Sequence, residues 1–561
     1  MSFRNAFSRR DFMRSLGAGA LASLSMVRSA NALVAGTGLF QHGVASGDPL
    51  ADRVIIWTRV TPAHPGSVPV FWEVALDAAF RRVIRRGRVI TNAARDYTVK
   101  VDVLGLPANA RLYYRFRAPT ETSPVGRTRT LPVGHVSQVK LAVFSCANYP
   151  AGYFHAYAEA AQLSDVFASV HLGDYLYEYE QGGYASDDAA ALGRLADPVN
   201  ELLSLDDYRR RHAQYRTDTD LQALHAAMPM IVVWDDHEIS NDTWREGAEN
   251  HDDATEGAFA QRRAAALQAY HEWLPTRLPN PGKPEQIYRG FQFGDLLSLH
   301  MLDTRVIGRD LQLDYANYFG ATGFDTARFT ADLTNPQRQM LGAAQSGWLS
   351  QRLAQSQATW DVLGQQVLMG RMDIPAPLVL GQISFTDYSI LVFKAQNGLP
   401  LTAQEQAVLA QPAIPYNLDA WDGYFMARET VLGTARALNK NLVVLSGDTH
   451  NAWASDLLDY QGNPVGVEFA TPGVSSPGLE EYFPLENPLA VAAGLTQIIG
   501  PLKYANTHQR GFMIVTASHD ECNAAWRFVD TVKSRNYVNI QGPVLYTFPG
   551  AGNRYLQGDV A

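Results

Sequence analysis

Four clusters of polar residues each follow directly after an apolar run, and their side chains are of the kinds that bind metal ions. The runs are 139–144, 166–170, 230–234 and 442–445, and the clusters are Ser145-Cys146-Ala147-Asn148, His171-Leu172-Gly173-Asp174, Asp235-Asp236-His237-Glu238 and Ser446-Gly447-Asp448-Thr449-His450. Polar groups at the end of a buried strand are costly unless they have partners. Metal ions or a tightly paired network would satisfy them. Four such clusters together predict a metal site.

The apolar runs themselves predict a layered α/β core over 138–561. Runs that are apolar throughout fit strands buried on both faces, and stretches such as 259–274 read as helices between them. In such folds ligands bind beyond the carboxyl ends of the strands, where we expect the four clusters to gather. The stretch 308–333 has Gly, Asn and Asp without clear periodicity, which favours a surface insertion or rim loop.

The segment 36–132 has a different pattern and carries no evident chemistry. Short strand-like runs at 54–57, 68–74 and 112–117 alternate with Gly, Pro and Asn turns. This predicts a small all-β domain, a sandwich of immunoglobulin or fibronectin type that serves in packing.

Length, charge and cysteine content restrict the function classes. A chain of 561 residues is expected to form two or more domains, and 46% hydrophobic residues exclude disorder as its main state. The net charge of −9 argues against a nucleic-acid scaffold role or an anionic membrane as partner. Only two cysteines occur, so disulfides do not hold the fold together, although one bridge between Cys146 and Cys522 remains an alternative.

The N-terminus has the features of a twin-arginine signal peptide over residues 1–32. Arg9-Arg10 lies within Ser8-Arg9-Arg10-Asp11-Phe12, an apolar run follows over 16–27, and Ala30-Asn31-Ala32 is an A-x-A cleavage site. An amphipathic basic helix is the alternative interpretation, but it does not explain the cleavage site. We expect export through the Tat machinery to the periplasm or the exterior. The apolar run is too short for a stable membrane span.

The clusters, in their order along the chain, resemble those of the calcineurin-like metallophosphoesterases, and in particular the alkaline phosphatase D (PhoD-like) family. The residues that carry the likeness are Gly43 to Pro49, Trp57-Thr58-Arg59, Ser145-Cys146, Gly173-Asp174-Tyr175-Leu176-Tyr177-Glu178, Trp234-Asp235-Asp236-His237-Glu238 and Ser446-Gly447-Asp448-Thr449-His450. The stretch 360–366 departs from the wider superfamily, because it offers Gln365 and Gln366 where those enzymes place a His. The resemblance implies a metallophosphoesterase-type layered β-sandwich core flanked by helices.

The resemblance also implies an unusual set of metals, Fe(III) together with Ca(II). Cys146, Asp174, Tyr177 and His450 suit Fe(III), and the remaining ligands, Asp235, Asp236, Asp448 and the shared Asp174, supply mainly oxygen, which favours Ca(II). Zn, Mn or Mg at a binuclear site is the alternative.

Other residues suggest roles around the metals. His237 is a candidate general acid for the leaving alcohol, or else a supporting partner of the ligands. Asn148, Arg209 and Arg216 are candidate substrate-binding residues, although two arginines on a helix are more often solvated or paired with acids. Asp303-Thr304-Arg305 ends another strand and suits either phosphate binding or pairing with acids.

The implied activity is that of a secreted, metal-dependent alkaline phosphatase. It would hydrolyse phosphate monoesters of small molecules, and also diesters, with metal-activated water. A phosphodiesterase or phospholipase acting on diesters is the close alternative, and a non-catalytic periplasmic binding protein is the remote one.

We predict that export depends on Arg9-Arg10 and that cleavage follows Ala32. Replacing both arginines by lysine should trap the precursor in the cytoplasm, measured by cell fractionation and by the N-terminal sequence of the mature protein. Normal export of this variant would contradict the signal assignment.

Overall fold

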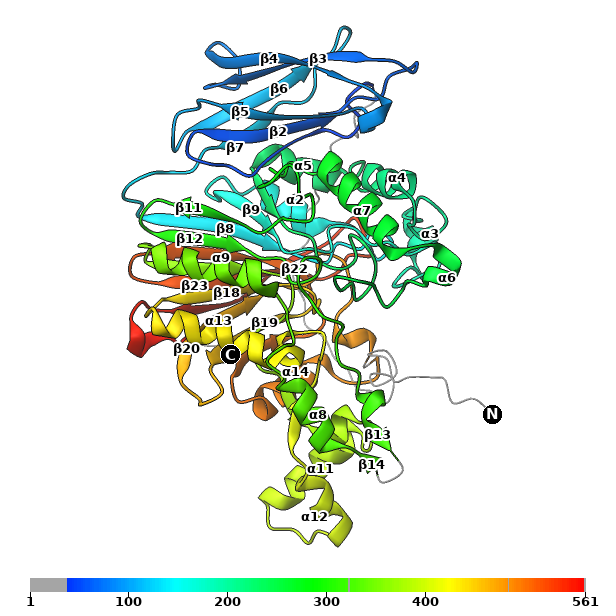
Figure 1. The fold of residues 1–561 in the computed structure, drawn as a ribbon, viewed down its shortest axis with the longest axis vertical. Helices are drawn as coiled ribbons and strands as arrows, with labels where there is room; N and C mark the ends of the chain where they lie inside the picture. Colours follow the sequence, from blue (N-terminus) through cyan, green and yellow to red (C-terminus); the bar gives the residue numbers. More distant parts are fainter. Residues whose placement is uncertain (1–37, 321–322, 483, 559–561) are drawn as a thin grey trace.

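Two large β-sheets share one hydrophobic core in the middle of the molecule (Figure 1). The computed structural model describes residues 38–320, 323–482 and 484–558. The nine-stranded sheet has the order β24 (Asn539–Thr547), β23 (Cys522–Val529), β22 (Arg510–Ser518), β8 (Gln138–Phe144), β9 (Ala168–His171), β10 (Met230–Val232), β1 (Val44–Gly47), β2 (Arg53–Arg59) and β5 (Thr98–Leu104). The predicted signal peptide lies outside the described residues.

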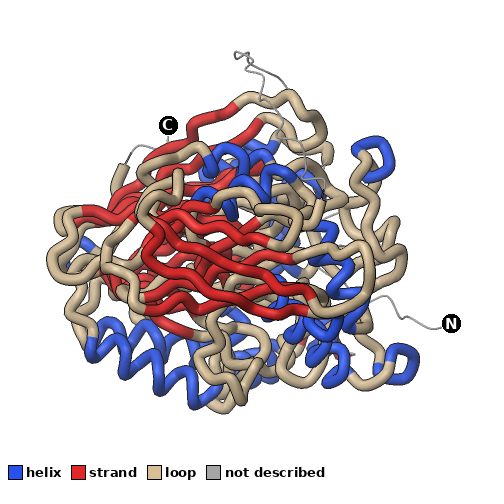
Figure 2. The backbone as a smooth tube through the Cα atoms, turned by 90° about the horizontal axis from the view of Figure 1, so that it is seen from above, coloured by secondary structure: helices blue, strands red, loops and turns tan. Residues whose placement is uncertain are grey.

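The seven-stranded sheet completes the central layers. Its order is β11 (Arg289–Phe293), β12 (Leu297–Met301), β15 (Trp360–Gly364), β18 (Leu442–Ser446), β20 (Pro464–Ala470), β19 (Ala452–Leu458) and β21 (Leu502–Asn506). Figure 2 shows the strands gathered in the middle of the view, with helices mainly along its lower and right sides. The predicted layered α/β core is confirmed.

Helices cover the sheets, which explains why the strands that carry the clusters are apolar on both faces. The helices α2 (His155–Ala161), α4 (Leu205–Tyr215), α5 (Thr219–Ala227) and α7 (Phe259–Trp273) pack into the main core with the nine-stranded sheet. The helices α9 (Gly342–Gln355) and α13 (Phe425–Ala437) pack on β15 and β18. Every residue of β9, β10, β15 and β18 is buried, as the runs of apolar residues predicted.

The strand directions bring the polar clusters to the same side of each sheet. Strands β8, β9 and β10 are parallel neighbours, so their carboxyl ends lie side by side. Strand β18 runs parallel to β15 and β20 in the other sheet. Ser145 forms an isolated parallel bridge to Gly473, beyond the end of β20, and this bridge joins the two sheets at the same edge.

The N-terminal region forms the predicted sandwich, but one of its sheets continues into the α/β core. Strand β1 pairs in parallel with β10, where Gly47 faces Met230, and antiparallel with β2. The second sheet of the sandwich has the order β4 (Val83–Thr91), β3 (Val68–Ala75), β6 (Arg111–Arg117) and β7 (Gly126–Arg129), and it shares a core with β1, β2 and β5. The blue strands at the top of Figure 1 are this region.

Smaller elements lie away from the central sheets. Helices α10 (Ala376–Val379), α11 (Phe385–Gln396) and α12 (Ala403–Leu409) form an extension at the end of the molecule opposite the sandwich (Figure 1). The remaining short elements of this half are β16 (Asp373–Pro375), β17 (Ala413–Pro415) and α14 (Pro488–Ile498), and two short helices precede α7: α3 (Ala189–Leu192) and α6 (Asp253–Glu256).

The stretch 308–333, predicted as a surface insertion or rim loop, contains short elements of its own. This stretch contains η3 (Tyr315–Tyr318), the two-residue strands β13 (Phe319–Gly320) and β14 (Gly323–Phe324), and α8 (Thr326–Leu333). Tyr318 and Phe329 pack edge to face and form a small core of their own with Leu418, which lies far away in the sequence. None of the described helices is both long and apolar enough to cross a membrane.

Asp48, which directly follows β1, fastens the N-terminal region to the α/β core. Its carboxylate accepts two bonds from the Arg289 guanidinium, at 2.7 and 2.8 Å, and one from the backbone N–H of Arg277 at 2.6 Å. Asp48 is fully buried and has a left-handed backbone with φ of 45°. Its position therefore depends on these partners.

Asp48→Ala should destabilise the protein strongly, because it leaves the buried Arg289 charge without its carboxylate. We expect a loss of about 3–5 kcal/mol in the free energy of unfolding, measured in urea. Asp52→Ala is the matched control: it removes an exposed partner of Arg53 a few residues away and should cost little. Equal losses from both substitutions would contradict this role of Asp48.

Candidate metal centre

The residues after β8, β9, β10 and β18 converge into one buried centre. Three groups have ligand atoms within 4.8 Å of one another: Cys146 with Asp174 and His450, Asp174 with Asp236 and His237, and Asp235 with Asp236 and Asp448. Asp174 belongs to the first two groups and Asp236 to the last two. The three groups are therefore contiguous, and together they could hold more than one metal ion.

Four of these residues have strained backbone conformations. The φ angles are 60° at Cys146, 53° at Asp174, 63° at Asp448 and 60° at His450. A left-handed conformation costs a residue with a Cβ about 1–2 kcal/mol, and such strain concentrates at functional sites. Each strand ends in a sharp turn that aims its side chain into the centre, which explains why the residues follow their strands so closely.

Tyr177 lies at the middle of the first group. Its hydroxyl is 3.0 Å from Asp174 Oδ2 and 3.1 Å from His450 Nε2, and Ser476 Oγ donates to it at 2.7 Å. Burial raises the pKa of Tyr177 well above its usual value, and the neighbouring Asp174 and Cys146 raise it further. A phenolate would therefore form here only in the presence of added positive charge.

His450 is oriented for metal binding by its second ring nitrogen. Its Nδ1 lies 2.7 Å from the carbonyl oxygen of Pro477, which can only accept, so Nδ1 carries the proton. The lone pair is then on Nε2, the atom that faces Tyr177 and Asp174. Metal-binding histidines are commonly fixed in this way by a backbone carbonyl.

The carboxylates of the centre are crowded and only partly paired within the described residues. Asp174 Oδ1, Asp235 Oδ2 and Asp236 Oδ1 are buried and accept no hydrogen bond there. Burial raises the pKa of Asp174 and Asp235 well above the usual range, and their mutual repulsion adds to this effect. Uncompensated oxygens with raised pKa values are what a cation would satisfy, so the donor set fits metal ions.

Arg305 supplies part of the missing positive charge from beneath the carboxylates. It lies 2.5 Å from Asp235, 2.8 Å from Asp419 and 3.4 Å from Asp448. Its side chain is fully buried. Within the Asp303-Thr304-Arg305 stretch, Arg305 therefore pairs with acids and compensates negative charge at the centre. Asp303 has a structural role instead, because it accepts backbone N–H groups of Arg305 and Val306.

Two further buried side chains hold the turns together. Glu238 accepts backbone N–H groups of Asp174, Tyr175 and Asp235, so it joins the turns after β9 and β10, and burial raises its pKa to about 7. Gln366 accepts from Thr304 and donates to the carbonyls of Trp234 and Leu302. Where the wider superfamily places a histidine, this chain thus has an amide that links strand ends.

His237 forms a dyad with Glu178 at the border of the centre. Its Nδ1 lies 2.7 Å from Glu178 Oε2, and Glu178 Oε1 accepts the backbone N–H of Asn241. Burial alone would lower the pKa of His237, but Asp236 and Glu178 together raise it well above its usual value. Glu178 therefore holds the ring in one orientation, and the surrounding carboxylates favour its protonated form.

A cavity of about 740 Å³ opens onto the centre. Asp174, Asp236, His237, Asp448 and His450 line it. The other lining residues are mostly acidic or aromatic: Tyr179, Glu180, Tyr184, Glu201, Asp242, Glu249, Asp252, Glu256 and Tyr482, together with Gly182, Gly183, Asn241, Asn250 and His251. No Lys or Arg is among these described lining residues. An anionic ligand could bind here only if bound cations reversed the local charge.

The two candidate phosphate-binding arginines lie elsewhere, which corrects that prediction. Arg209 binds Glu272 through two bonds of 2.7 Å and also the carbonyl of Ala94. Arg216 is fully buried, stacks over Trp57 and donates to the carbonyl of His42. Both join α4 to the N-terminal region. The sequence of α4 indicated a basic helix, but the partners of its two arginines lie in segments far away in the sequence.

The remaining predicted residues have mixed outcomes. Asn148 is buried near the centre. Its side-chain amide donates to the backbone carbonyl of Tyr184, a cavity residue, and its backbone carbonyl accepts a hydrogen bond from the Ser475 hydroxyl. Cys146 and Cys522 are both free thiols, so the alternative of a bridge between them is wrong. Cys522 packs in the main core.

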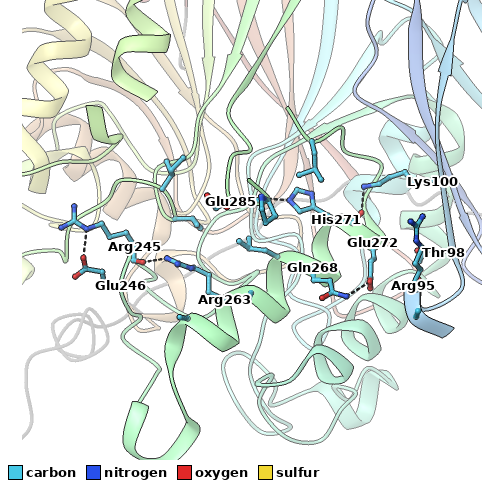
Figure 3. A pocket seen from close by; sticks show the side chains of 18 residues that line it. Arg95, Thr98, Lys100, Arg245, Glu246, Arg263, Gln268, His271, Glu272 and Glu285 are labelled. Carbon is cyan, nitrogen blue, oxygen red and sulfur yellow. Dashed lines mark hydrogen bonds and ion pairs between the residues drawn. The ribbon is translucent and has the colours of Figure 1, made fainter. Parts of the chain in front are cut away.

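A larger cavity of about 1000 Å³ lies between α7 and the N-terminal region (Figure 3). Several of its polar side chains have protein partners: Lys100 donates to the carbonyl of Leu274, Arg245 pairs with Glu246, and Gln268 donates to Glu272. It contains none of the grouped metal-ligand candidates. We therefore place the chemistry in the smaller cavity.

Sequence reasoning missed three residues of the site. Glu178 directly follows Tyr177 and was quoted in the motif without a role, although its position beside the ligands was a usable signal. Asp419 does not follow an apolar strand, so the sequence offered no signal for it. Only the structure shows that Arg305 and Arg309 both pair with its carboxylate. Asp242 lies in a loop, and its carboxylate accepts from Gln312.

Comparison with known proteins finds relatives along nearly the whole chain. The model of the PhoD-like phosphatase matches residues 141–526, and that of the PhoD-like phosphatase N-terminal domain matches residues 27–132. Alkaline phosphatase D of Bacillus subtilis (strain 168) is 38% identical over 504 residues, which cover 84% of this chain and 77% of the relative. A solved structure of PhoD aligns with a TM-score of 0.75 and 33% identity, over 93% of this chain and 92% of that one.

Proposed function

This chain belongs to the PhoD-like phosphatase family and is a phosphoric ester hydrolase, and on that premise we propose that it hydrolyses phosphate monoesters at the centre formed after β8, β9, β10 and β18. One observation carries the assignment of the site. The strained turns bring a Cys, several carboxylates, a Tyr and a His together at the floor of an acidic cavity.

Binding of the phosphate requires the metal ions, because the cavity lining is acidic. Cys146, Asp174, Tyr177 and His450 would hold one ion, and Asp235, Asp236 and Asp448 would help to hold the others. When bound, the ions would offset the charge of the phosphoryl group and lower the pKa of a water molecule for attack.

We propose Fe(III) for the first group and Ca(II) for the carboxylate groups. Thiolate and phenolate are strong donors to ferric iron, and the unpaired carboxylate oxygens of Asp174, Asp235 and Asp236 suit a hard cation such as Ca(II). The raised pKa values of Cys146 and Tyr177, caused first by burial, mean that both would lose their protons only to a strongly charged ion.

His237 would protonate the leaving alcohol. It lines the cavity, its Nδ1 is bound to Glu178, and its other nitrogen is therefore the one available to a substrate. The neighbouring Asp236 and Glu178 raise its pKa, which favours the protonated ring that a general acid needs. Glu178 positions the ring in the same way that a carboxylate orients a catalytic histidine.

We further propose that residues 1–32 direct export by the Tat route and that the mature enzyme acts in the periplasm or outside the cell. The support is the paired arginines, the short apolar run and the A-x-A site. This route carries folded proteins, which suits an enzyme that takes up metal before export.

His237→Ala should slow esters of poorly acidic alcohols by about 10²–10⁴-fold and activated aryl esters far less, because only the former need a proton on the leaving oxygen. The comparison of kcat/KM for an alkyl and a nitrophenyl phosphate measures this. Equal losses on both substrates would give His237 a supporting role instead.

Glu178→Gln provides a test of the dyad through pH. The carboxylate of Glu178 raises the pKa of His237, and activity that needs the protonated ring is lost as pH rises through that pKa. Removing the charge lowers the pKa, so the basic limb of the pH–kcat profile should move to lower pH. An unchanged limb would show that His237 does not act as the acid.

Tyr177→Phe should weaken or shift a visible charge-transfer band of the iron-loaded enzyme and lower its activity, because the phenolate is lost while the ring still packs. Tyr179→Phe is the matched control: this tyrosine lines the same cavity, but its hydroxyl binds Asn241. Cys146→Ser should perturb the band, and Cys522→Ser should not. A colourless, fully active enzyme that contains only zinc would contradict the iron assignment.

A further inference from the structure

A second group of metal-ligand side chains lies at the opposite end of β8 from the catalytic centre. His135 and His519 both face the carboxylate of Asp295, with ligand atoms within 4.8 Å of one another. Cys146 follows the carboxyl end of β8, whereas His135 precedes its first residue, so the length of a seven-residue strand, about 23 Å, separates the two places. The group is therefore independent of the chemistry described above.

The three side chains come from three separate segments. His135 lies in the stretch that leads from the N-terminal region into β8, Asp295 in the turn between β11 and β12, and His519 in the turn between β22 and β23. The pairing of β22 with β8, where Ser518 faces Gln138, brings the last of these next to the first. The group thus lies where the two large sheets meet.

The distances between these ligand atoms are compatible with one shared cation. Asp295 Oδ2 lies 3.0 Å from His135 Nδ1, and Asp295 Oδ1 lies 3.5 Å from His519 Nε2. Bonds of 2.0–2.2 Å to a tetrahedral ion would place neighbouring ligand atoms about 3.4 Å apart. The two imidazole rings are stacked in parallel, with centroids 5.0 Å apart and an interplanar angle of 7°.

His519 Nε2 gives the independent sign of a missing ligand. This atom is buried, and within the described residues it forms no hydrogen bond, although a buried ring nitrogen normally has a partner. The other nitrogen of the ring, Nδ1, lies 2.6 Å from the Thr359 hydroxyl. When Nδ1–H donates to Thr359, the lone pair is on Nε2 and points toward Asp295, as in a metal-bound histidine.

Backbone contacts hold the carboxylate in place. Asp295 N donates to the carbonyl of Gly134, Val136 N donates to Asp295 Oδ1 at 3.0 Å, and Thr359 N donates to the carbonyl of Asp295. The site is therefore positioned by the fold and does not depend on a metal to gather its residues.

We propose that His135, Asp295 and His519 bind one divalent transition-metal ion such as Zn²⁺, which fastens the entry of β8 to the β11–β12 and β22–β23 turns. Two imidazoles and one carboxylate suit Zn²⁺, Ni²⁺ or Cu²⁺, whereas Ca²⁺ and Mg²⁺ prefer oxygen ligands alone. The role is structural: the ion joins the segment between the two domains to both sheets of the catalytic core.

Titration of the purified holoenzyme with Zn²⁺ alone, followed by calorimetry, tests the proposal. The wild-type protein should take up one equivalent that His135→Ala and His519→Ala each bind at least tenfold more weakly, with phosphatase activity unchanged in both variants. His64→Ala is the matched control, since His64 is an exposed histidine of the N-terminal region and should leave the uptake intact. Asp295→Asn keeps the shape of the turn and removes the charge, so it serves if a histidine variant fails to fold.

Cu²⁺ in place of Zn²⁺ gives a second readout that catalytic metal binding would not produce. Its electron paramagnetic resonance spectrum should show coupling to two imidazole nitrogens in the wild type and to one in either histidine variant. Equal Zn²⁺ uptake by the wild type and the His135→Ala/His519→Ala double variant would overturn the proposal. So would uptake that occurs only together with a change in activity, because that metal would occupy the catalytic centre.

Discussion

Compensation of buried negative charge is the constraint on which the rest of this structure depends. Asp174, Asp235, Asp236 and Asp448 come together at the ends of strands from two sheets, and Arg305 alone cannot balance them. Isolated carboxylates in such a place would take up protons instead of remaining charged. Metal ions bound by these carboxylates would resolve this conflict, and the same ions would allow an acidic protein with an acidic cavity to bind phosphate. Stability and activity therefore share one requirement.

The centre is built at turns whose backbone conformations are strained. Cys146, Asp174 and Asp448 all have left-handed backbones at turns that a glycine would form more easily. Glu238 holds the turn at Asp174 by accepting two backbone N–H groups, and Gln366 links the chain after β10 to the chain after β12. The fully buried strands behind them provide the rigid support. Rigid elements of this kind fix ligand side chains more precisely than loops do, which is what a site with several metals needs.

The N-terminal region contributes stability to the same framework. Strand β1 extends the catalytic sheet next to β10, the strand that leads into Asp235, and Asp48 secures this junction by its pairing with Arg289. The sandwich is thus a continuation of the catalytic core and not a separate attached module. At the other end of β8, the proposed site of His135, Asp295 and His519 would secure the second connection between the two regions.

Local sequence determined much of this protein, because the apolar runs had to become buried strands and the polar residues directly after them had to lie at the strand ends. Cys146, Asp174, Asp236 and His450 could be singled out in this way, and the order of the motifs indicated the family. The tertiary structure decided what depends on distant partners. It showed that β8, β9 and β10 belong to one sheet and β18 to the other, that Arg209 and Arg216 pair far from the centre, and that Arg305 and Asp419 lie beneath it. An arginine side chain is long and pairs with whichever carboxylate or ring the folded chain brings near, so sequence spacing alone does not define its partner.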